Sequence, residues 1–205
     1  MTLKLLGSTS GHTAINAPAS AGSNTLVLPP NNGTAGQVLH TDGNGNLTFI
    51  YPCGYGHFNA YLSASQTVTN NSEETIEFNT VEGQNGQGNA QSWYNNSTYK
   101  YTPQVAGVYR FHVNCFWTAA TDNKAIKMRA RVRKNGSDYI ADNYAGIDDQ
   151  YGAFAHDATC ISYMNGSSDY IEFRASSHAD DGTNGVLQGG YVQYTYGFGY
   201  LLEAA

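Results

Sequence analysis

The hydrophobic pattern along this chain repeats every second residue. The clearest stretch runs from Val108 to Thr118, where large or apolar side chains occupy alternate positions: Tyr109, Phe111, Val113, Cys115 and Trp117. The positions between them are polar except for Phe116. Successive side chains of a β-strand point to opposite faces, so the pattern predicts a strand with one buried face. No window repeats apolar residues at helical spacing, which makes the expected fold all-β.

Further short apolar stretches lie between turn signals at the intervals of a sandwich or jelly roll. We expect strands at residues 58–63, 66–69, 75–78, 99–102, 108–118, 126–134, 154–164, 170–176 and 190–202. Asn-Gly steps such as Asn135-Gly136 and Asn165-Gly166 separate several of them. These dipeptides supply the positive φ angles of tight turns, which supports the strand boundaries.

The last predicted strand has aromatic or apolar side chains on both faces. Tyr194, Tyr196, Phe198 and Tyr200 share one face, and Gly197, Gly199 and Leu201 share the other. With 16 Tyr, 8 Phe and 2 Trp, the chain has more aromatic residues than a two-layer core of this size usually needs. Surplus tyrosine suits a subunit interface, where the ring is buried and the hydroxyl finds a partner. The predicted interface comprises Tyr109, Phe116, Tyr194, Tyr196, Phe198 and Tyr200; the alternative is that these rings form the core and rim of one subunit.

The first 56 residues differ in composition from the rest. Residues 1–52 contain four of the five prolines, and their aromatic residues are confined to Phe49 and Tyr51. Short apolar pieces at 25–28, 37–41 and 47–50 alternate with turn clusters. Such a segment cannot bury enough apolar area to offset its own ordering entropy. We therefore expect residues 1–56 to form an extended arm of short β segments, lying on copies of itself or on another protein, before a knob domain at 57–205.

Five pieces of the second region carry a family resemblance. They are FNAYLSASQTVTNN (58–71), YNNSTYKYTPQVAGVYRF (94–111), RKNGSDY (133–139), SDYIEFRASS (168–177) and YTYGFGYLL (194–202). Their order and spacing resemble the jelly roll of complement globular heads and tumour-necrosis-factor-like proteins. The most specific signal is T-P-x-x-A-G-x-Y-x-F with a closing G-F-G-Y-L. The resemblance implies a ten-stranded, two-sheet sandwich that forms a homotrimer, with adjacent first and last strands.

The first region resembles a segment that stands beside such knobs in tail-fibre and capsid-associated proteins of phages. The matching pieces are GSTSGHT (7–13), APA (17–19), TLVLP (25–29) and GQVLHTDGNGNL (36–47). The resemblance implies a bacteriophage virion protein whose residues 1–50 attach to the major capsid protein or to a tail protein. The chain lacks a collagen-like stalk and the calcium cluster of the complement branch.

Charge and cysteine content narrow the expected partners and compartment. The net charge of −6 disfavours nucleic acid, and no apolar run approaches the ~20 residues of a membrane span. The N-terminal residues do not form a secretory leader, so we expect assembly in a host cytoplasm and a location on the virion surface. The three cysteines, Cys53, Cys115 and Cys160, suit free thiols, with a Cys115–Cys160 bridge as the alternative.

A row of cations is the strongest candidate for a binding surface. Six of the ten basic residues fall between Lys124 and Lys134, and in a strand Lys127, Arg129, Arg131 and Arg133 would point to one side. The row could dock an acidic capsid surface or a host glycan. The favoured alternative is a solvated face, or salt bridges to Asp138, Asp142, Asp148 and Asp149.

The remaining polar groups predict no enzyme, metal or cofactor. Asp148–Asp149 and Asp180–Asp181 could bind Ca²⁺ through oxygens, but solvated turns are the favoured interpretation. The histidines, at 12, 40, 57, 112, 156 and 178, lack metal-ligand spacing, and we expect His112 to be a hydrogen-bonded structural residue. His156 and Cys160 would lie about 13 Å apart along one strand, too far for a Cys–His nucleophile.

Two functions follow from these features. The favoured hypothesis is a non-enzymatic trimeric capsid decoration or head-fibre protein. The other is a receptor-binding tail-fibre tip, in which the loops at 139–152 and 178–190 hold host glycans. A secreted cytokine-like module is disfavoured because no leader is expected.

Overall fold

A computed structural model describes residues 2–16, 18–20, 22–82, 88–89, 91–119, 125–146 and 153–205. Within these ranges the chain contains β-strands and no helix. It divides into two compact units, Met1–Ile50 and Tyr51–Ala205, and each is described by itself below. The all-β prediction is confirmed.

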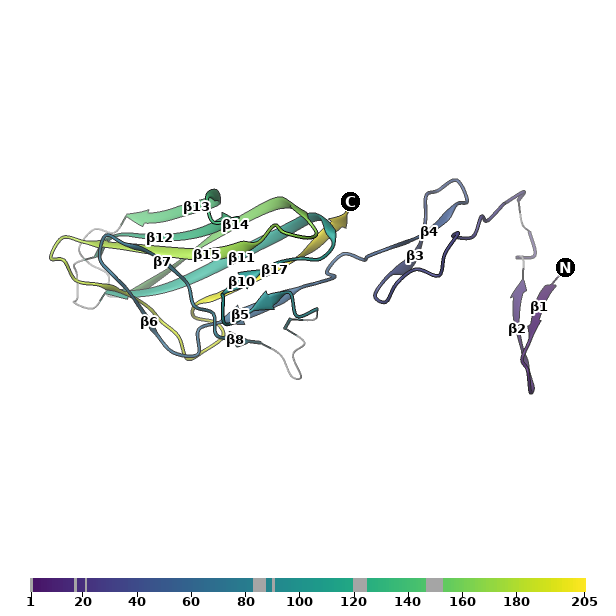
Figure 1. The fold of residues 1–205 in the computed structure, drawn as a ribbon, viewed down its shortest axis with the longest axis horizontal. Helices are drawn as coiled ribbons and strands as arrows, with labels where there is room; N and C mark the ends of the chain where they lie inside the picture. Colours follow the sequence, from purple (N-terminus) through teal and green to yellow (C-terminus); the bar gives the residue numbers. More distant parts are fainter. Residues whose placement is uncertain are drawn as a thin grey trace. The chain divides into compact units, whose positions relative to one another are not determined.

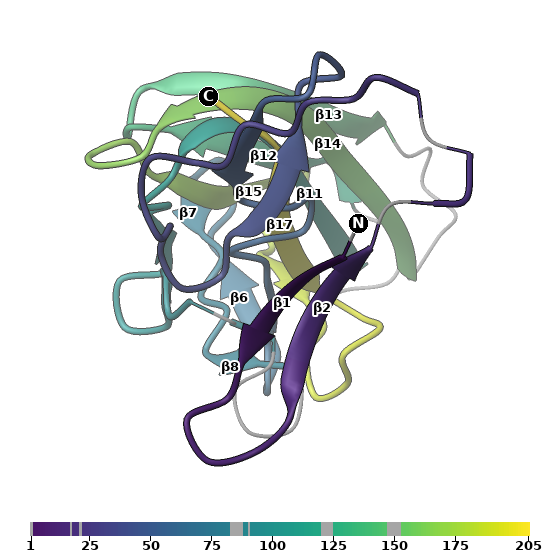
Figure 2. The same ribbon diagram turned by 90° about the vertical axis from the view of Figure 1, so that its right-hand side faces the viewer.

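The first unit contains two antiparallel hairpins. β1 (Thr2–Leu6) pairs with β2 (His12–Asn16), and β3 (Val38–Thr41) pairs with β4 (Leu47–Ile50). The β1–β2 ribbon is prominent in Figure 2. In the turn between β3 and β4, the Asp42 carboxylate accepts hydrogen bonds from the backbone N–H groups of Asn44 (2.8 Å) and Asn46 (3.1 Å). The apolar piece at 25–28 contributes a single β-bridge at Val27 rather than a strand.

The second unit, the knob, is a two-sheet sandwich (Figure 1). The β12 sheet contains β7 (Glu73–Thr75), β9 (Tyr94–Asn95), β10 (Lys100–Tyr101), β12 (Ala125–Lys134), β13 (Asp138–Gly146) and β15 (Ile171–Ala179). The β11 sheet contains β5 (Phe58–Tyr61), β6 (Gln66–Val68), β8 (Thr80–Val81), β11 (Ala106–Ala119), β14 (Ala153–Asn165), β16 (Gly185–Leu187) and β17 (Tyr196–Ala204).

The long central strand β11 follows the sequence pattern closely. All five alternating residues from Tyr109 to Trp117 have 0% exposed surface. They face the opposite sheet, where Phe173 and Met128 are buried as well. Aromatic rings fill much of the space between the sheets: Tyr101 lies 4.6 Å from Phe58, centroid to centroid. The predicted apolar face of this strand is therefore confirmed as the core face.

Strand β17 places its glycines toward the core and its large rings outside. A Cβ atom at Gly199 would lie 2.5 Å from a ring carbon of Phe111 and 2.8 Å from one of Phe58. At Gly197 it would lie 2.7 Å from a ring carbon of Phe78. These positions are small because aromatic side chains of the core occupy the space. The residues before Tyr196 form turns, so the strand begins six positions later than residue 190, the predicted start.

The first and last strands of the knob are adjacent, as the resemblance implied. β5 pairs antiparallel with β17, and the Gly54 N–H donates to the Leu201 carbonyl at 2.7 Å. The chain therefore enters and leaves the knob at one end. Because residues from Tyr51 onward pack on this end, the two units divide at residue 50, whereas the predicted boundary was at residue 56.

The knob contains more and shorter strands than the ten that we expected. The described part of the knob contains thirteen strand segments, several of them only two or three residues long. The clearest omission from the prediction is β13, which hydrogen-bonds to β12 along its length. Its side chains are mostly exposed, so it has little of the apolar alternation that marks the other long strands.

Candidate functional site

The outer side of the β11 sheet carries a cluster of partly exposed rings. We call Phe116, Tyr194, Tyr196, Phe198 and Tyr200 the aromatic face. Phe116 stacks on Tyr194 with centroids 5.1 Å apart, and Phe198 stacks on Tyr200 at 6.2 Å. These five rings, all predicted interface residues, are brought together and each stays half-buried in the single subunit.

Tyr109 does not belong to this group, and its assignment to an interface was wrong. Its side chain is completely buried in the core of its own subunit, where the ring stacks on Phe111 at 6.1 Å. The Tyr109 hydroxyl donates to the Val105 carbonyl at 2.8 Å. An odd position on β11 faces the opposite sheet, so this ring cannot reach another molecule.

His112 on β11 contacts the aromatic face as well. Its ring stacks on Phe198 with centroids 4.9 Å apart, and its Nδ1 lies 2.7 Å from Thr159 Oγ1. Burial lowers the pKa of His112 below its ordinary value, and the nearby Asp157 carboxylate opposes this effect. The hydrogen bond confirms a structural role for the residue. Sequence reasoning did not connect it with the rings of β17.

The cysteines form no disulfide. Cys53, Cys115 and Cys160 are all free. In the β11–β14 register, Cys115 faces His156 and Cys160 faces Phe111, which places the two cysteines four residues apart along the sheet. Burial raises the pKa of the Cys160 thiol to about 12. Neither a bridge nor an activated thiolate is supported.

The four cations of β12 lie on the outer side of the β12 sheet. We call Lys127, Arg129, Arg131 and Arg133 the basic row. The neighbouring strands place other side chains beside it in a regular register. Lys127 faces His178 on β15, Arg129 faces Ser176 on β15 and Tyr144 on β13, and Arg131 faces Asp142 on β13. The four side chains therefore point to the same side of β12, as the sequence pattern predicted.

Acidic side chains neutralise one end of the basic row. Glu73 accepts hydrogen bonds from Arg131 and from Arg174 Nε (3.2 Å), and it lies 3.5 Å from Arg133. Asp142 accepts from Arg131 Nε at 3.0 Å. The favoured salt-bridge interpretation is therefore confirmed at Arg131.

The partners of the row are not all the expected ones. Asp142 is a partner as expected, but Glu73 lies 58 residues from Arg131 in sequence and was missed. Asp138 instead accepts a hydrogen bond from the Ser137 hydroxyl at 3.1 Å. Lys124, Asp148 and Asp149 lie outside the described residues.

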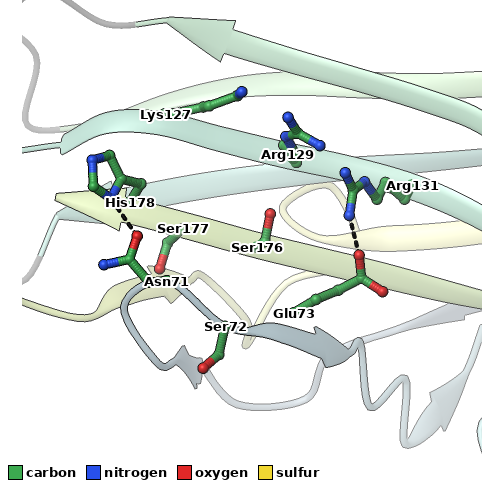
Figure 3. A pocket seen from close by; sticks show the side chains of 9 residues that line it. All are labelled: Asn71, Ser72, Glu73, Lys127, Arg129, Arg131, Ser176, Ser177 and His178. Atoms are coloured by element: carbon green, nitrogen blue, oxygen red, sulfur yellow. Dashed lines mark hydrogen bonds and ion pairs between the residues drawn. The ribbon is translucent and has the colours of Figure 1, made fainter.

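A cavity of about 240 Å³ is lined by three members of the row, Lys127, Arg129 and Arg131, and we call it the Lys127 pocket. Figure 3 shows its lining side chains, which come from β12, β15, β7 and the segment before β7: Asn71, Ser72, Glu73, Lys127, Arg129, Arg131, Ser176, Ser177 and His178. The Lys127 ammonium lies 4.6 Å from the centroid of the Tyr144 ring. The His178 ring is hydrogen-bonded to the Asn71 side chain.

The other candidate sites do not gather ligands. Asp181 accepts hydrogen bonds from the backbone N–H of Thr183 (3.0 Å) and from its hydroxyl (2.7 Å), as expected for a turn residue. In the part of the chain that the structure describes, no three His, Cys, Asp or Glu side chains form a possible metal site. The proposed glycan loops are also shorter than expected, because residues 138–146 form β13 and residues 185–187 form β16.

Apolar side chains of the first unit remain uncovered. In the β1–β2 hairpin Leu3 lies opposite Ile15, and these side chains are 58% and 61% exposed. Leu6 and Leu28 are exposed by 82% and 73%. A two-stranded ribbon is at best marginally stable in water, and an apolar surface of this kind is typical of contact with another molecule.

No helix long and apolar enough to cross a membrane occurs among the described residues. No family model and no curated protein sequence matches the chain. Solved structures do resemble it. Eiger, a TNF of S. frugiperda, aligns over 75% of this chain and 95% of its own, with a TM-score of 0.51 and 10% identity.

Two further solved structures align at 10% identity. The globular domain of zebrafish complement 1qA protein matches with a TM-score of 0.46, over 73% of this chain and 99% of its own. Murine APRIL matches with a TM-score of 0.44, over 71% and 99%. With the Eiger alignment and the strand topology, the fold prediction is confirmed: the chain contains a two-sheet jelly roll of the TNF type.

Proposed function

We propose that the protein is a non-enzymatic structural component of a bacteriophage virion, a homotrimeric capsid decoration or head-fibre protein. In this proposal residues 1–50 attach the trimer to the major capsid protein and the knob projects from the surface. The exposed leucines of the first unit are the observation that carries it. The segment has no core of its own, and contact with another protein would bury these apolar side chains. The sequence pieces at 7–47 support a phage context.

The aromatic face supports the trimer. Strand β17 has glycine toward the core and Tyr196, Phe198 and Tyr200 outside, an arrangement that offers large rings to a neighbouring molecule. On β14, which β11 separates from β17, Ile161 and Tyr163 are 64% and 51% exposed. Three copies that pack these surfaces around a common axis would remove the rings from water.

Light scattering of the full chain tests the trimer. The expected mass is about 66 kDa, three times the subunit mass of 22.1 kDa. Phe198→Asp should reduce it to one subunit, because a carboxylate would be buried between copies without a partner. Tyr144→Asp is the matched control, since Tyr144 is 61% exposed on the other sheet, and it should keep the trimer mass. A stable lone subunit of the unaltered chain in dilute neutral buffer would refute the trimer.

Deletion of residues 1–50 tests the attachment. The truncated chain keeps the whole knob core, so it should remain folded with the mass of a trimer. It should fail to bind purified particles that the full chain decorates. Truncated protein that still decorates them would refute the role of the arm.

A receptor-binding tail-fibre tip is the second candidate, and the basic row with its neighbouring tyrosines favours it. Cation, hydroxyl and aromatic groups together are suited to sugars. Adsorption of the purified protein to host cells, without any decoration of capsids, would favour this role over the first.

A further inference from the structure

Positive charge is unevenly compensated along the basic row. Around Arg131 and Arg133 three carboxylates are within 4 Å: those of Glu73, Asp142 and Glu172. Among the described residues Arg129 has one carboxylate partner, Asp142, at 3.3 Å from Nη1, and it shares this partner with Arg131. Lys127 has no carboxylate within that distance in the described parts of the chain. The surplus charge therefore lies at the Lys127 pocket.

Glu73 lines the same pocket but does not cancel this charge. Its carboxylate accepts hydrogen bonds from Arg131, Arg174 and the Tyr139 hydroxyl, the last at 3.0 Å. These donors hold the carboxylate at the edge of the pocket nearest Arg131, as Figure 3 shows for the Arg131 contact. An incoming anion would meet Lys127 and Arg129 first.

Uncharged polar groups complete the lining. Ser176 lies beside Arg129 in the β12–β15 register, and Ser72 borders the pocket from the segment before β7. Within the described residues neither hydroxyl makes a hydrogen bond, whereas the Ser177 hydroxyl donates to the Val68 carbonyl at 3.1 Å. The hydroxyls of Ser176 and Ser72 are thus available to a ligand that has hydroxyl groups of its own.

The two cations are held in position before any ligand arrives. The Tyr144 ring lies 4.6 Å from the Lys127 ammonium and 5.8 Å from the Arg129 guanidinium carbon. Contact with an aromatic face restricts these long side chains, which lowers the entropic cost of binding. A guanidinium with one free edge matches a carboxylate in two parallel hydrogen bonds.

We propose that the Lys127 pocket binds one carboxylate-bearing sugar, a sialic or uronic acid unit of a surface glycan. Arg129 and Lys127 bind the carboxylate, and Ser176, Ser72 and Asn71 hydrogen-bond the ring hydroxyls. A volume of about 240 Å³ leaves room for one sugar ring. The net charge of −6 repels long polyanions, whereas a ligand with a single charge responds mainly to the local cations. All nine lining residues belong to the knob, so the pocket does not include the arm.

Ligand-observed NMR titration of the full chain at low salt tests the site. The probes are the methyl glycosides of N-acetylneuraminic acid and glucuronic acid, with methyl galactoside as the neutral comparison. At least one acidic glycoside should bind at millimolar concentration, and comparison of the two identifies which kind of acidic sugar fits. The galactoside should bind at least about tenfold more weakly, since it lacks the charge that Arg129 recognises.

Arg129→Gln and Lys127→Gln should each weaken binding at least about tenfold while the thermal midpoint is retained. Two variants are used so that the result does not depend on one of them folding normally. Lys100→Gln is the matched control: it removes the same charge from the same sheet at β10, beside Glu172 rather than the pocket. Its affinity should stay within about twofold of the unaltered chain.

Three results would overturn the assignment. One is the absence of binding to both acidic glycosides at about 10 mM, a concentration ten times the expected dissociation constant of ~1 mM. A second is equal weakening by Lys100→Gln and Arg129→Gln, which would show a general charge effect. The third is competition by acetate as strong as that of the glycosides, which would mean an anion site without sugar selectivity.

Discussion

Replacing Gly199 by alanine tests whether the core explains the arrangement of β17. The added Cβ would lie 2.5 Å and 2.8 Å from two ring carbons of Phe111, and 2.8 Å from one of Phe58. Both rings are at most 1% exposed, and Tyr101 packs against each of them. They have little room to move, so overpacking should cost about 1–3 kcal/mol.

The backbone itself would accept alanine at this position. Gly199 does not have a positive φ, so the substitution should gain about 0.4–1 kcal/mol by restricting the unfolded chain. The net expectation for Gly199→Ala is a loss of about 0–2.6 kcal/mol in the free energy of unfolding, centred at ~1.3 kcal/mol. Urea unfolding at one fixed protein concentration measures it, since oligomer stability depends on concentration.

Gly146→Ala provides the matched control. Gly146 lies at the end of β13 and lacks a positive φ, and no atom of the described residues lies within 4 Å of the added Cβ. This variant should keep the stability of the unaltered chain or gain about 0.4–1 kcal/mol. If Gly199→Ala behaves in the same way, the core rings are free to move and the packing argument for β17 is wrong.

Two further predictions concern charged and titratable groups. Glu73→Gln should lower the free energy of unfolding by about 2 kcal/mol in urea titrations, because three arginines lose their shared partner. Asp142→Asn is the comparison, and it should cost at most about 1 kcal/mol because the Asp142 side chain is 38% exposed. Equal losses would contradict the central role of Glu73. Burial lowers the pKa of His156 below its ordinary value of 6.5, so the unfolded chain takes up a proton first and stability should fall as pH drops below about 6.5. His156→Gln should reduce this slope between pH 7.5 and 5.5, and an unchanged slope would assign it to other groups.

Strands with one clear apolar face could be predicted from the sequence, and strands without one could not. β11 has five consecutive inward positions with apolar or aromatic side chains, and all are buried. β13 has no comparable set, since most of its side chains are exposed. It exists because its backbone completes hydrogen bonds with β12 at the edge of the sheet. That partner is a tertiary feature which local composition does not reveal.

The candidate site shows the same division. The spacing of Lys127 and Arg129 predicts that both point to one side of a strand, which needs only the period of the backbone. The β12–β15 register then places His178 beside Lys127 and Ser176 beside Arg129, although about 50 residues separate them in sequence. Whether a cation is neutralised or left for a ligand depends on these distant neighbours.

The sequence by itself determined the fold class, the two alternating faces of the long strands, the low content of large apolar side chains in the first 50 residues and the grouping of the cations. Each of these depends on local spacing or composition. Only the tertiary structure decided that Tyr109 belongs to the core, that the glycines of β17 face inward and Phe198 faces outward, and that Glu73 neutralises Arg131. A strand pattern defines two faces but not which neighbours each face meets, because pairing between distant strands and the volume of the core make that choice.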